Sequence, residues 1–327
     1  MPKRILFLSK GELDSSTRYR ALQYFPYFLS AGWQPKHVTI SGGVLAIFNA
    51  LISAKKSDVV VLLRKSLPFP ILWLLRKVSK KLVFDFDDAI FCNSDGSYSQ
   101  TRIKRFIKTA TMCDHIFAGN AYLAEEASKY NPKVTIIPTS VDSNKYALPR
   151  QNKPGNTVLV WIGSSSTRKY LEQALPFLEK ASLIVPNLQL DVIADFELKS
   201  ELLVINSIAW SESSEAAALS KADIGIAPMP ETDWTKGKCA LKVLQYMAAG
   251  LPVISSKSGV NAYVVQDGVN GYLVNEDAQW GELIAKLSCN KHTLDAMGQA
   301  GIDRVKSEFD INAVFKKLLA VLESEST

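Results

Sequence analysis

The chain has 327 residues, of which 47% are hydrophobic and 21% are charged. This composition is ordinary for a globular protein with room for two domains, so it excludes intrinsic disorder. The net charge of +6 is modest and its basic residues are spread along the chain, which argues against nucleic acid as a main partner. No apolar run approaches the roughly 20 residues of a membrane span, and no signal peptide precedes the first strand, so we expect a cytoplasmic protein.

The four cysteines and three histidines are scattered along the sequence. The cysteines lack the close pairs that zinc sites use, so we expect neither disulfides nor a cysteine-bound metal. His37 and His115 come where strands begin. A hydrogen-bonded structural imidazole is the expectation at both positions, and a catalytic histidine is the alternative.

Predicted strands and helices alternate through the first part of the chain, which is typical of a parallel sheet covered on both faces. The predicted strands are 5–8, 38–40, 59–63, 82–86, 115–118 and 134–137. The predicted helices are 17–31, 44–54, 70–79, 97–112 and 121–129.

Residues 143–156 contain two prolines, a glycine and mostly polar side chains, so they predict a linker without core positions of its own. A second alternating unit follows, with predicted strands 158–162, 188–193, 206–210, 224–227 and 253–255. Its predicted helices are 169–181, 215–220, 238–249, 278–288 and 311–323.

The pattern therefore predicts an α/β protein with two doubly wound, Rossmann-like domains, 1–150 and 151–327, that face a central cleft. A C-terminal helix at about 308–327 could pack back on the first domain. In such sheets the carboxyl ends of the strands hold the ligand.

The run from Gly237 to Val274 is the most informative part of the sequence. A helix predicted to begin at Lys238 places Lys238, Lys242 and Gln245 on one stripe, so two ammonium groups and an amide share a helix face. A basic helix start suits a phosphate, and solvated lysines are the alternative. The main-chain amides at this start belong to Cys239, Ala240 and Leu241.

A second candidate phosphate-binding element follows the predicted strand 158–162. There a buried strand ends in glycine and hydroxyl side chains before a helix, which is typical of an anion-binding nest. The hydroxyl groups could instead cap the helix, and both roles can hold at once. The residues concerned are Gly163, Ser164, Ser165, Ser166, Arg168 and Lys169.

The densest basic cluster, RKVSKK at 76–81, follows the apolar run PFPILWLL at 68–75. Together they could rest against an anionic bilayer surface. A crossover helix with a solvated end is the preferred alternative.

Several segments resemble retaining glycosyltransferases of the GT-B fold, specifically family 4, also called glycosyltransferase group 1. In the second half the resemblance rests on ADIGIAPMP, LQYMAAGLPVISSKSGV and VQDGVNGYLV. In the first half it rests on SSTRYRALQYFPYFLSAGW, VFDFDDAIF, GNAYLAEEA and IIPTSVD. It therefore spans nearly the whole chain.

This resemblance implies a hexosyltransferase that moves a sugar from a nucleoside diphosphate sugar to a hydroxyl acceptor. The anomeric configuration is kept, and neither a metal nor another cofactor takes part. A UDP-sugar is the favoured donor, with a GDP-sugar as the alternative. A saccharide or lipid-linked saccharide is the expected acceptor, in polysaccharide or glycolipid synthesis at the inner membrane face. A non-catalytic nucleotide-sugar-binding protein and a GT-B epimerase are the other classes considered.

Under this resemblance, Lys238 and Lys242 stabilise the leaving diphosphate together with the amides of the helix start. The family carries two glutamates separated by seven residues, and these positions fall on Gly237 and Gln245. Gln245 keeps a carbonyl oxygen that could accept from the ribose, whereas Gly237 has no side chain to contact the sugar. Trp210 could stack on the base or pack in the core.

In the first domain, Arg18 and Arg20 could bind anionic parts of the donor or acceptor, or could stay solvated. Asp85, Asp87 and Asp88 close a strand. Three acids so close together also suit a metal site or a general base pair, but they alternate in face along one strand, so we prefer acceptor orientation by Asp87 or Asp88.

Asn120 stands where a strand ends and a helix begins. Its side chain could line the cleft, but capping of the helix is the expected role.

Overall fold

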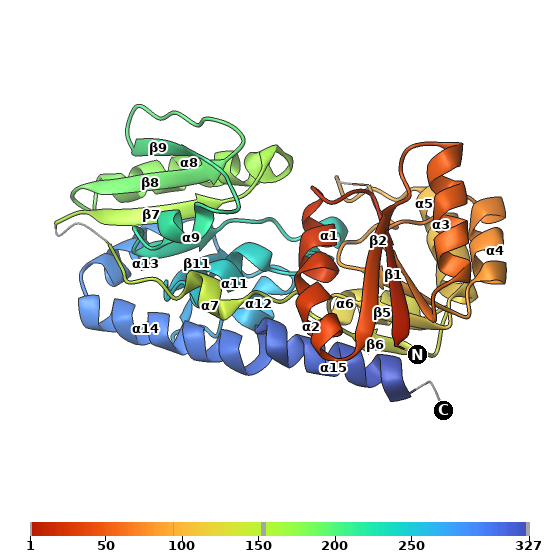
Figure 1. The fold of residues 1–327 in the computed structure, drawn as a ribbon. Coiled ribbons are helices and arrows are strands. Elements are labelled where there is room, and N and C mark those ends of the chain that lie inside the picture. The colour runs from red at the N-terminus through yellow and green to blue at the C-terminus, as the bar shows by residue number, and fades with distance from the viewer. Residues whose placement is uncertain (1, 94, 152–154, 325–327) are drawn as a thin grey trace. The chain divides into compact units, whose positions relative to one another are not determined.

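The computed structural model describes residues 2–93, 95–151 and 155–324. The described residues form two compact units, each built on a parallel sheet with helices around it (Figure 1). The predicted α/β class with two doubly wound domains is therefore confirmed.

The first unit contains the residues up to Ser140, the segment Thr232–Cys239 and the C-terminal residues from Val314. Its parallel sheet has the order β2-β1-β3-β4-β5-β6. The strands are β1 (Lys3–Ser9), β2 (Trp33–Thr39), β3 (Val59–Leu63), β4 (Lys81–Phe86), β5 (His115–Ala118) and β6 (Val134–Ile136). The helices are α1 (Ser15–Arg20), η1 (Leu22–Tyr24), α2 (Phe25–Ser30), α3 (Val44–Lys55), α4 (Phe69–Val78), α5 (Gln100–Met112), α6 (Ala121–Ser128), α10 (Asp233–Lys236) and α15 (Ile311–Ser324), the last of which enters the unit at Val314.

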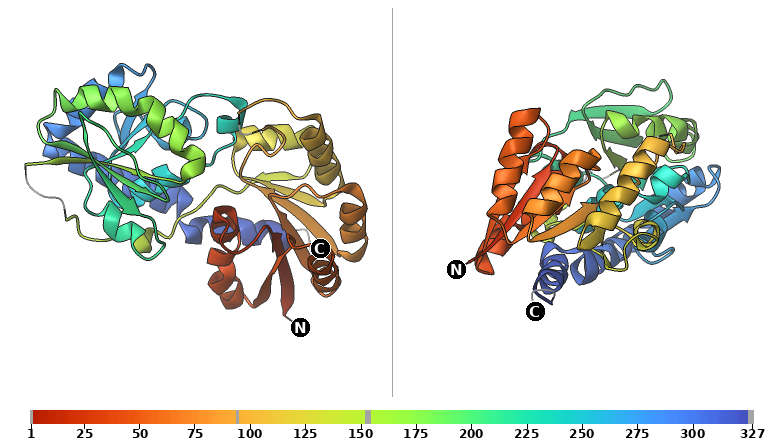
Figure 2. Two further views of the ribbon diagram at one scale, coloured as in Figure 1. Left: turned by 90° about the horizontal axis from the view of Figure 1, so that it is seen from above. Right: turned by 90° about the vertical axis from the view of Figure 1, so that its right-hand side faces the viewer.

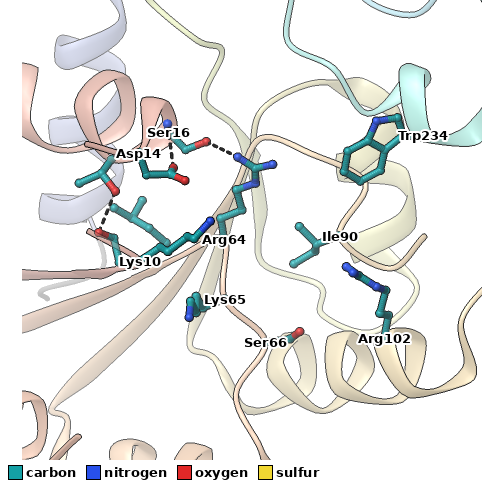
Figure 3. Close-up of a pocket in the computed structure, with 12 residues that line it drawn as sticks. Lys10, Asp14, Ser16, Arg64, Lys65, Ser66, Ile90, Arg102 and Trp234 are labelled. Atoms are coloured by element: carbon teal, nitrogen blue, oxygen red, sulfur yellow. Dashed lines mark hydrogen bonds between the residues drawn. The ribbon is translucent and has the colours of Figure 1, made fainter. Parts of the chain in front are cut away.

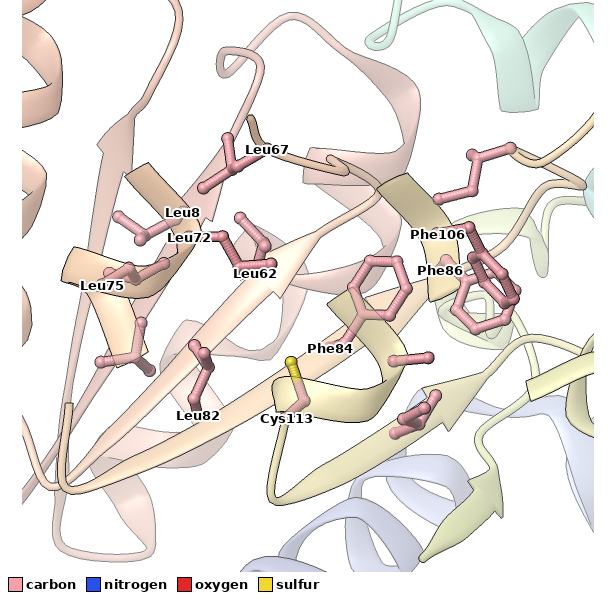
Figure 4. Close-up of a cluster of buried hydrophobic side chains, with 14 of the residues drawn as sticks. Leu8, Leu62, Leu67, Leu72, Leu75, Leu82, Phe84, Phe86, Phe106 and Cys113 are labelled. Atoms are coloured by element: carbon pink, nitrogen blue, oxygen red, sulfur yellow. The ribbon is translucent and has the colours of Figure 1, made fainter. Parts of the chain in front are cut away.

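Alternate strand residues of the first unit pack on opposite faces of its sheet. On one face, Leu62 and Phe84 join apolar side chains of α4 and α5 in a buried cluster (Figure 4). On the other face, the ring of Phe7 packs against Phe28 of α2, with centroids 5.8 Å apart. Phe28 in turn meets Phe315 of α15 edge-on at 4.9 Å, so α15 completes this core.

The predicted helix 17–31 is interrupted after α1. Ala21 has a φ of −133°, and the 3-10 turn η1 separates α1 from α2. Pro26 has no N–H to donate to the carbonyl of Leu22. The backbone N–H of Phe25 donates to the carbonyl of Leu22 instead, which is the i to i+3 hydrogen bond of a 3-10 turn.

The second unit contains Val141–Glu231 and Ala240–Ala313, and its parallel sheet has the order β12-β11-β10-β7-β8-β9. The strands are β7 (Thr157–Ile162), β8 (Leu188–Ala194), β9 (Val204–Ala209), β10 (Ile224–Ala227), β11 (Val253–Ser256) and β12 (Gly271–Val274). The helices are α7 (Ser143–Tyr146), η2 (Ser165–Thr167), α8 (Arg168–Ser182), α9 (Glu215–Leu219), α11 (Leu241–Ala248), α12 (Asn261–Val264), α13 (Gln279–Ser288), α14 (Lys291–Arg304) and η3 (Val305–Phe309).

Strand β12 is absent from the predicted elements. It is four residues long and begins at Gly271, so its sequence reads as the end of a glycine-containing loop. The glycine has a packing reason, because a Cβ at this position would collide with the carbonyl oxygen of Val253 on β11. The close pairing with β11 therefore requires glycine here.

The predicted linker 143–156 does contain core positions. Residues 143–146 form α7, and Tyr146 is only 2% exposed. Val141 pairs with Asp310, whose carboxylate also accepts from the hydroxyl of Ser143. These contacts move the boundary between the units from residue 150 to Ser140. Residues 152–154 of the predicted linker lie outside the described residues.

The replacement Phe315→Ala tests how much α15 contributes to the first unit. Truncation of a buried phenylalanine costs about 3–5 kcal/mol of unfolding free energy, through lost burial and the cavity left behind. We expect a loss in this range when urea unfolding is followed by circular dichroism. The exposed neighbour Lys316→Ala is the control, and equal stability of the two variants would contradict the packing role.

Candidate active site

Asp85, at the carboxyl end of β4, is neutralised inside the first unit. Its carboxylate accepts from Nε of Arg20 at 2.6 Å and from Nη2 at 2.8 Å. The remaining nitrogen, Nη1, donates to the carbonyl of Ile137. Arg20 is 3% exposed, so the prediction that it binds anionic parts of a ligand is wrong. Arg18 on the same helix is half-buried beside the ring of Tyr19, and its predicted role stays a prediction.

Asp87 and Asp88 meet Arg64, a residue that the sequence patterns did not single out. Ser16 donates to Asp87 at 2.8 Å and 3.0 Å, and Nη1 of Arg64 donates to the same hydroxyl at 2.9 Å. Asp88 forms ion pairs with Arg64 and with Nζ of Lys238, the latter at 2.7 Å. Arg64 has a φ of 51°, in the left-handed region that non-glycine residues rarely occupy.

The surroundings of Asp88 exclude direct contact with a substrate. Its side chain is buried, and burial raises its pKa while Lys238 and Arg64 oppose that rise. The predicted acceptor-orienting role is therefore wrong for Asp88 and stays a prediction for Asp87. Within the described residues, no group of three or more His, Cys, Asp or Glu side chains could hold a metal ion.

The two histidines of the first unit have hydroxyl partners, as predicted for structural imidazoles. Nε2 of His37 lies 2.8 Å from Oγ of Ser9, and Nε2 of His115 lies 2.9 Å from Oγ1 of Thr135. Both rings are buried.

The segment Thr232–Cys239 is attached to the first unit by polar contacts. The amide of Asn120 donates to the carbonyls of Lys236 and Lys238, each at 3.1 Å. Its oxygen accepts from the backbone N–H of Leu123 at 2.9 Å, so the predicted capping role is confirmed. Burial raises the pKa of the Cys239 thiol, which donates to the carbonyl of Asp87.

Lys238 does not belong to the predicted helix. Helix α11 begins at Leu241, because Ala240 has a φ of 56° and a left-handed residue cannot continue a right-handed helix. Lys238 is instead paired with Asp88, and its Nζ lies 4.5 Å from the ring centroid of Trp234. The predicted stripe shared by Lys238, Lys242 and Gln245 is therefore wrong.

Gly237 occupies the position of the first family glutamate and is enclosed by the first unit. A Cβ here would collide with the backbone nitrogen of Ala89 and lie 2.7 Å from its Cβ. The segment lies too close to Ala89 for any side chain at this position. The backbone of Ala89 therefore occupies the space that a glutamate side chain at position 237 would need.

In the second unit, Lys242 lies in the first turn of α11. Its Nζ is 4.1 Å from the ring centroid of Trp161, a fully buried residue of β7. A Cβ at Gly163 would also collide with this ring. Lys242, Trp161 and Gly163 therefore come together at the carboxyl end of β7, where Rossmann-like sheets bind ligands.

The hydroxyl-rich loop after β7 is partly occupied by an anion of the chain itself. The backbone N–H and the hydroxyl of Ser165 both donate to Asp195, at 2.7 Å and 2.8 Å. These hydrogen bonds hold the pKa of Asp195 below its usual range. Neither η2 nor α8 has a side-chain capping hydrogen bond, so the predicted capping by Ser or Thr is wrong.

Arg168 and Lys169, the two cations at the start of α8, each have a neighbour within the second unit. Arg168 donates to Glu172 at 2.7 Å, and Nζ of Lys169 lies 5.1 Å from the ring centroid of Tyr170.

Gln245 belongs to a buried hydrogen-bond network. It is 4% exposed, and its amide donates at 2.9 Å to the hydroxyl of Tyr146. That hydroxyl donates to Glu215 at 2.7 Å, and Nε1 of Trp210 donates to the same carboxylate at 2.9 Å. Trp210 is 37% exposed, so the core-packing alternative for it is wrong. Tyr146 and Glu215 carried no sequence signal, because they join the network only through tertiary contacts.

The first unit also contains a cavity of about 230 Å³ beside the carboxyl ends of β1 and β3 (Figure 3). Most of its lining is polar or cationic. The lining residues are Ser9, Lys10, Asp14, Ser16, Thr17, Leu63, Arg64, Lys65, Ser66, Ile90, Arg102 and Trp234.

Comparison with known families gives a match to part of the chain, most of it in the second unit. Residues 147–290 match the family model described as Glycosyl transferases group 1. Spore coat protein SA of Bacillus subtilis (strain 168) is 34% identical over 80 residues, which make up 24% of this chain and 21% of that protein. The chain thus spans about a fifth of the length of this curated relative.

Solved structures extend the likeness to nearly the whole chain. Anabaena HepE, in complex with UDP and glucose, has a TM-score of 0.76 at 13% identity, over 99% of this chain and 100% of that one. Sucrose-phosphate synthase from Thermosynechococcus elongatus has a TM-score of 0.74 at 14% identity, over 99% of this chain and 100% of that one. These likenesses show the GT-B fold.

Gly237→Ala tests the close packing on Ala89. We expect a loss of about 1–3 kcal/mol in unfolding free energy because the added methyl group overpacks the site, and a larger loss for Gly237→Glu. The matched control is Gly281→Ala in α13, where the nearest atom to an added Cβ is 3.8 Å away. Wild-type stability of Gly237→Glu in thermal unfolding would show that the segment can move away to accept the family glutamate.

Proposed function

We propose that this chain is a glycosyltransferase that moves a sugar from a nucleoside diphosphate sugar to a hydroxyl acceptor with retention and without a metal. The group 1 match over residues 147–290 supports this reaction. A UDP-sugar is the favoured donor, since the HepE structure of the same fold is in complex with UDP and glucose. A GDP-sugar is the alternative. The proposed context is polysaccharide or glycolipid synthesis in the cytoplasm.

The position of Lys242 is the observation that carries the proposal. The first-turn N–H groups of a helix lack intrahelical partners and carry partial positive charge. Lys242 adds a full charge in the first turn of α11, close to the end of β7. A departing diphosphate needs such preorganised donors and cations in a transfer that uses no metal. We therefore assign stabilisation of the leaving diphosphate to Lys242 and the start of α11, with the loop from Gly163 to Lys169 beside them.

The network around Glu215 suits recognition of the nucleoside. Glu215 fixes the indole nitrogen of Trp210, so the partly exposed ring has a defined orientation on which a base could stack. The amide of Gln245 donates to the hydroxyl of Tyr146, which in turn donates to this carboxylate. Because Gln245 is buried and donates to Tyr146, we assign it a positioning role in this network, and its contact with the ribose stays a prediction.

The acceptor role in the first unit goes to Asp87. Its carboxylate accepts from Ser16, and Ser16 lines the cavity. An acceptor hydroxyl beside the cavity, near Ser16, would therefore lie close to a carboxylate that is held in place. We keep Asp87 as the group that orients the acceptor.

Lys242→Met tests the donor site. Loss of a hydrogen bond to a charged group costs about 1.5–3 kcal/mol, so we expect UDP affinity to fall about 10- to 100-fold in isothermal titration. The matched control is Lys286→Met, because Nζ of Lys286 also lies over a ring, that of Tyr272 at 4.6 Å.

A thermal-shift panel of UDP, GDP and their sugars identifies the donor, because a ligand at 100 times its Kd stabilises by about 2.7 kcal/mol. Absence of a shift with every nucleotide would overturn the proposal. Binding without sugar transfer or donor hydrolysis would favour a non-catalytic binding protein. Appearance of an isomeric nucleotide sugar would favour an epimerase.

We also propose that the first unit contacts an anionic membrane surface through α3 and α4, which pack side by side (Figure 2). Large apolar residues are exposed on both helices, with Leu45 at 83%. The others are Val44, Phe48, Ile52, Phe69, Trp73 and Leu74. Lys77 lies near the ring of Trp73 and Lys108 near that of Phe69, so cations flank the apolar surface. Within the described residues, no helix is long and apolar enough to cross a membrane.

This surface is tested by cosedimentation with phosphatidylcholine vesicles with or without phosphatidylglycerol. We expect binding that needs the anionic lipid and falls at least about tenfold in Phe48→Ser/Trp73→Ser, because two exposed rings no longer insert. The control replaces exposed apolar residues of the second unit, Leu183→Ser/Ile184→Ser. Equal vesicle binding by the two double variants would contradict the assignment.

A further inference from the structure

The cavity of the first unit lies at a topological switch point of its sheet. From β1 the sheet extends to β2 on one side and to β3 on the other. Loops after such neighbouring strands diverge, so the crevice at their carboxyl ends is the usual ligand site of a doubly wound sheet. Ser9 and Lys10 at the end of β1, and Leu63 to Lys65 at the end of β3, line the cavity. The topology of the sheet therefore favours ligand binding in this cavity, independently of any residue motif.

The lining of this cavity carries an excess of positive charge. Lys10 and Lys65 lie in the loops after β1 and β3, Arg102 lies on α5, and the three surround Arg64 (Figure 3). Arg64 is neutralised by Asp88, but the other three cations form no ion pair within the described residues. The only carboxylate in the lining is that of Asp14, which accepts from the backbone N–H of Ser16 as the cap of α1.

The other lining residues suit a small polar group that belongs to a larger ligand molecule. Lys65 is held by the hydroxyl of Ser41, at 2.7 Å from its Nζ, so this cation is oriented before a ligand arrives. Ile90 and the indole of Trp234 provide an apolar wall. A volume of about 230 Å³ is below the roughly 300–1,000 Å³ of sites that enclose a drug-sized ligand. The cavity therefore accommodates one group of a ligand rather than the whole ligand.

We propose that this cavity binds an oxyanion carried by the acceptor, a phosphate or a carboxylate, through Lys10, Lys65 and Arg102. As a statement about the acceptor, this inference rests on the proposed transferase function. The phosphate of a lipid-linked saccharide and the carboxylate of an acidic sugar share the chemistry that the three cations recognise. A neutral saccharide without such a group would leave them without a counter-charge.

The experiment titrates the whole chain with inorganic phosphate, glucuronate and glucose at constant ionic strength, by isothermal titration. We expect at least one of the two anions to bind and glucose not to bind. Lys65→Gln and Arg102→Gln each remove one charged contact and should weaken binding about tenfold. The control is Lys104→Gln, an exposed lysine on α5 that does not line the cavity. Binding of phosphate alone points to a phosphorylated acceptor, and binding of glucuronate to an acidic sugar. Equal affinity for the anion in the wild-type chain and in the three variants would overturn the proposal.

A parallel UDP titration separates this inference from the proposed function. Lys242→Met should lose UDP and keep the anion, whereas Lys65→Gln should lose the anion and keep UDP. Loss of UDP in Lys65→Gln would overturn the assignment to the acceptor and place the cavity with the donor. If UDP fails to bind the wild-type chain while the anion binds and depends on Lys65, the transferase proposal fails and the oxyanion site stands.

Discussion

The carboxylate of Asp88 lies between two cations, Arg64 at the end of β3 and Lys238 in the segment Thr232–Cys239. Because this acid is buried, removal of either cation would leave a poorly compensated charge, and such losses cost several kcal/mol. Arg64 also donates to Ser16, so the same ion pair positions a hydroxyl on the wall of the cavity. Both the cavity and the segment therefore depend on Asp88.

The ion pair with Asp88 gives Lys238 a structural role, which distinguishes it from the basic residues that we propose to bind ligands. Lys238 is paired with Asp88 within the first unit, whereas Lys242, which we propose stabilises a diphosphate, lies in the first turn of α11 in the second unit. The three cations around the cavity are separate from both. Each unit thus presents positive charge at the carboxyl ends of its strands, the edge where doubly wound sheets place their ligands. Two anionic groups, one on the donor and one on the acceptor, match that distribution.

Much of the fold was predictable because its strands are buried on both faces. The runs at Val59–Leu63, His115–Ala118 and Ile224–Ala227 agree with prediction at both ends. Continuous apolar runs between turn residues are characteristic of such strands. Strand β12 was not predicted, because its pairing depends on the close approach of Gly271 to Val253. A contact between residues so far apart in the chain leaves no pattern in the local sequence.

The α/β alternation, the two doubly wound domains and the capping role of Asn120 could all be predicted from the amino-acid sequence alone. These features follow from periodicity and from residues adjacent in the chain. The separation of the two lysines depends on the folded chain, because Ala240 is left-handed and the distant Asp88 pairs with Lys238, so Lys238 lies outside α11. The tertiary structure also decided that Gln245 faces inward to Tyr146, a partner 99 residues away. Such long-range pairs depend on how the sheet and helices pack, so no local spacing could have shown them.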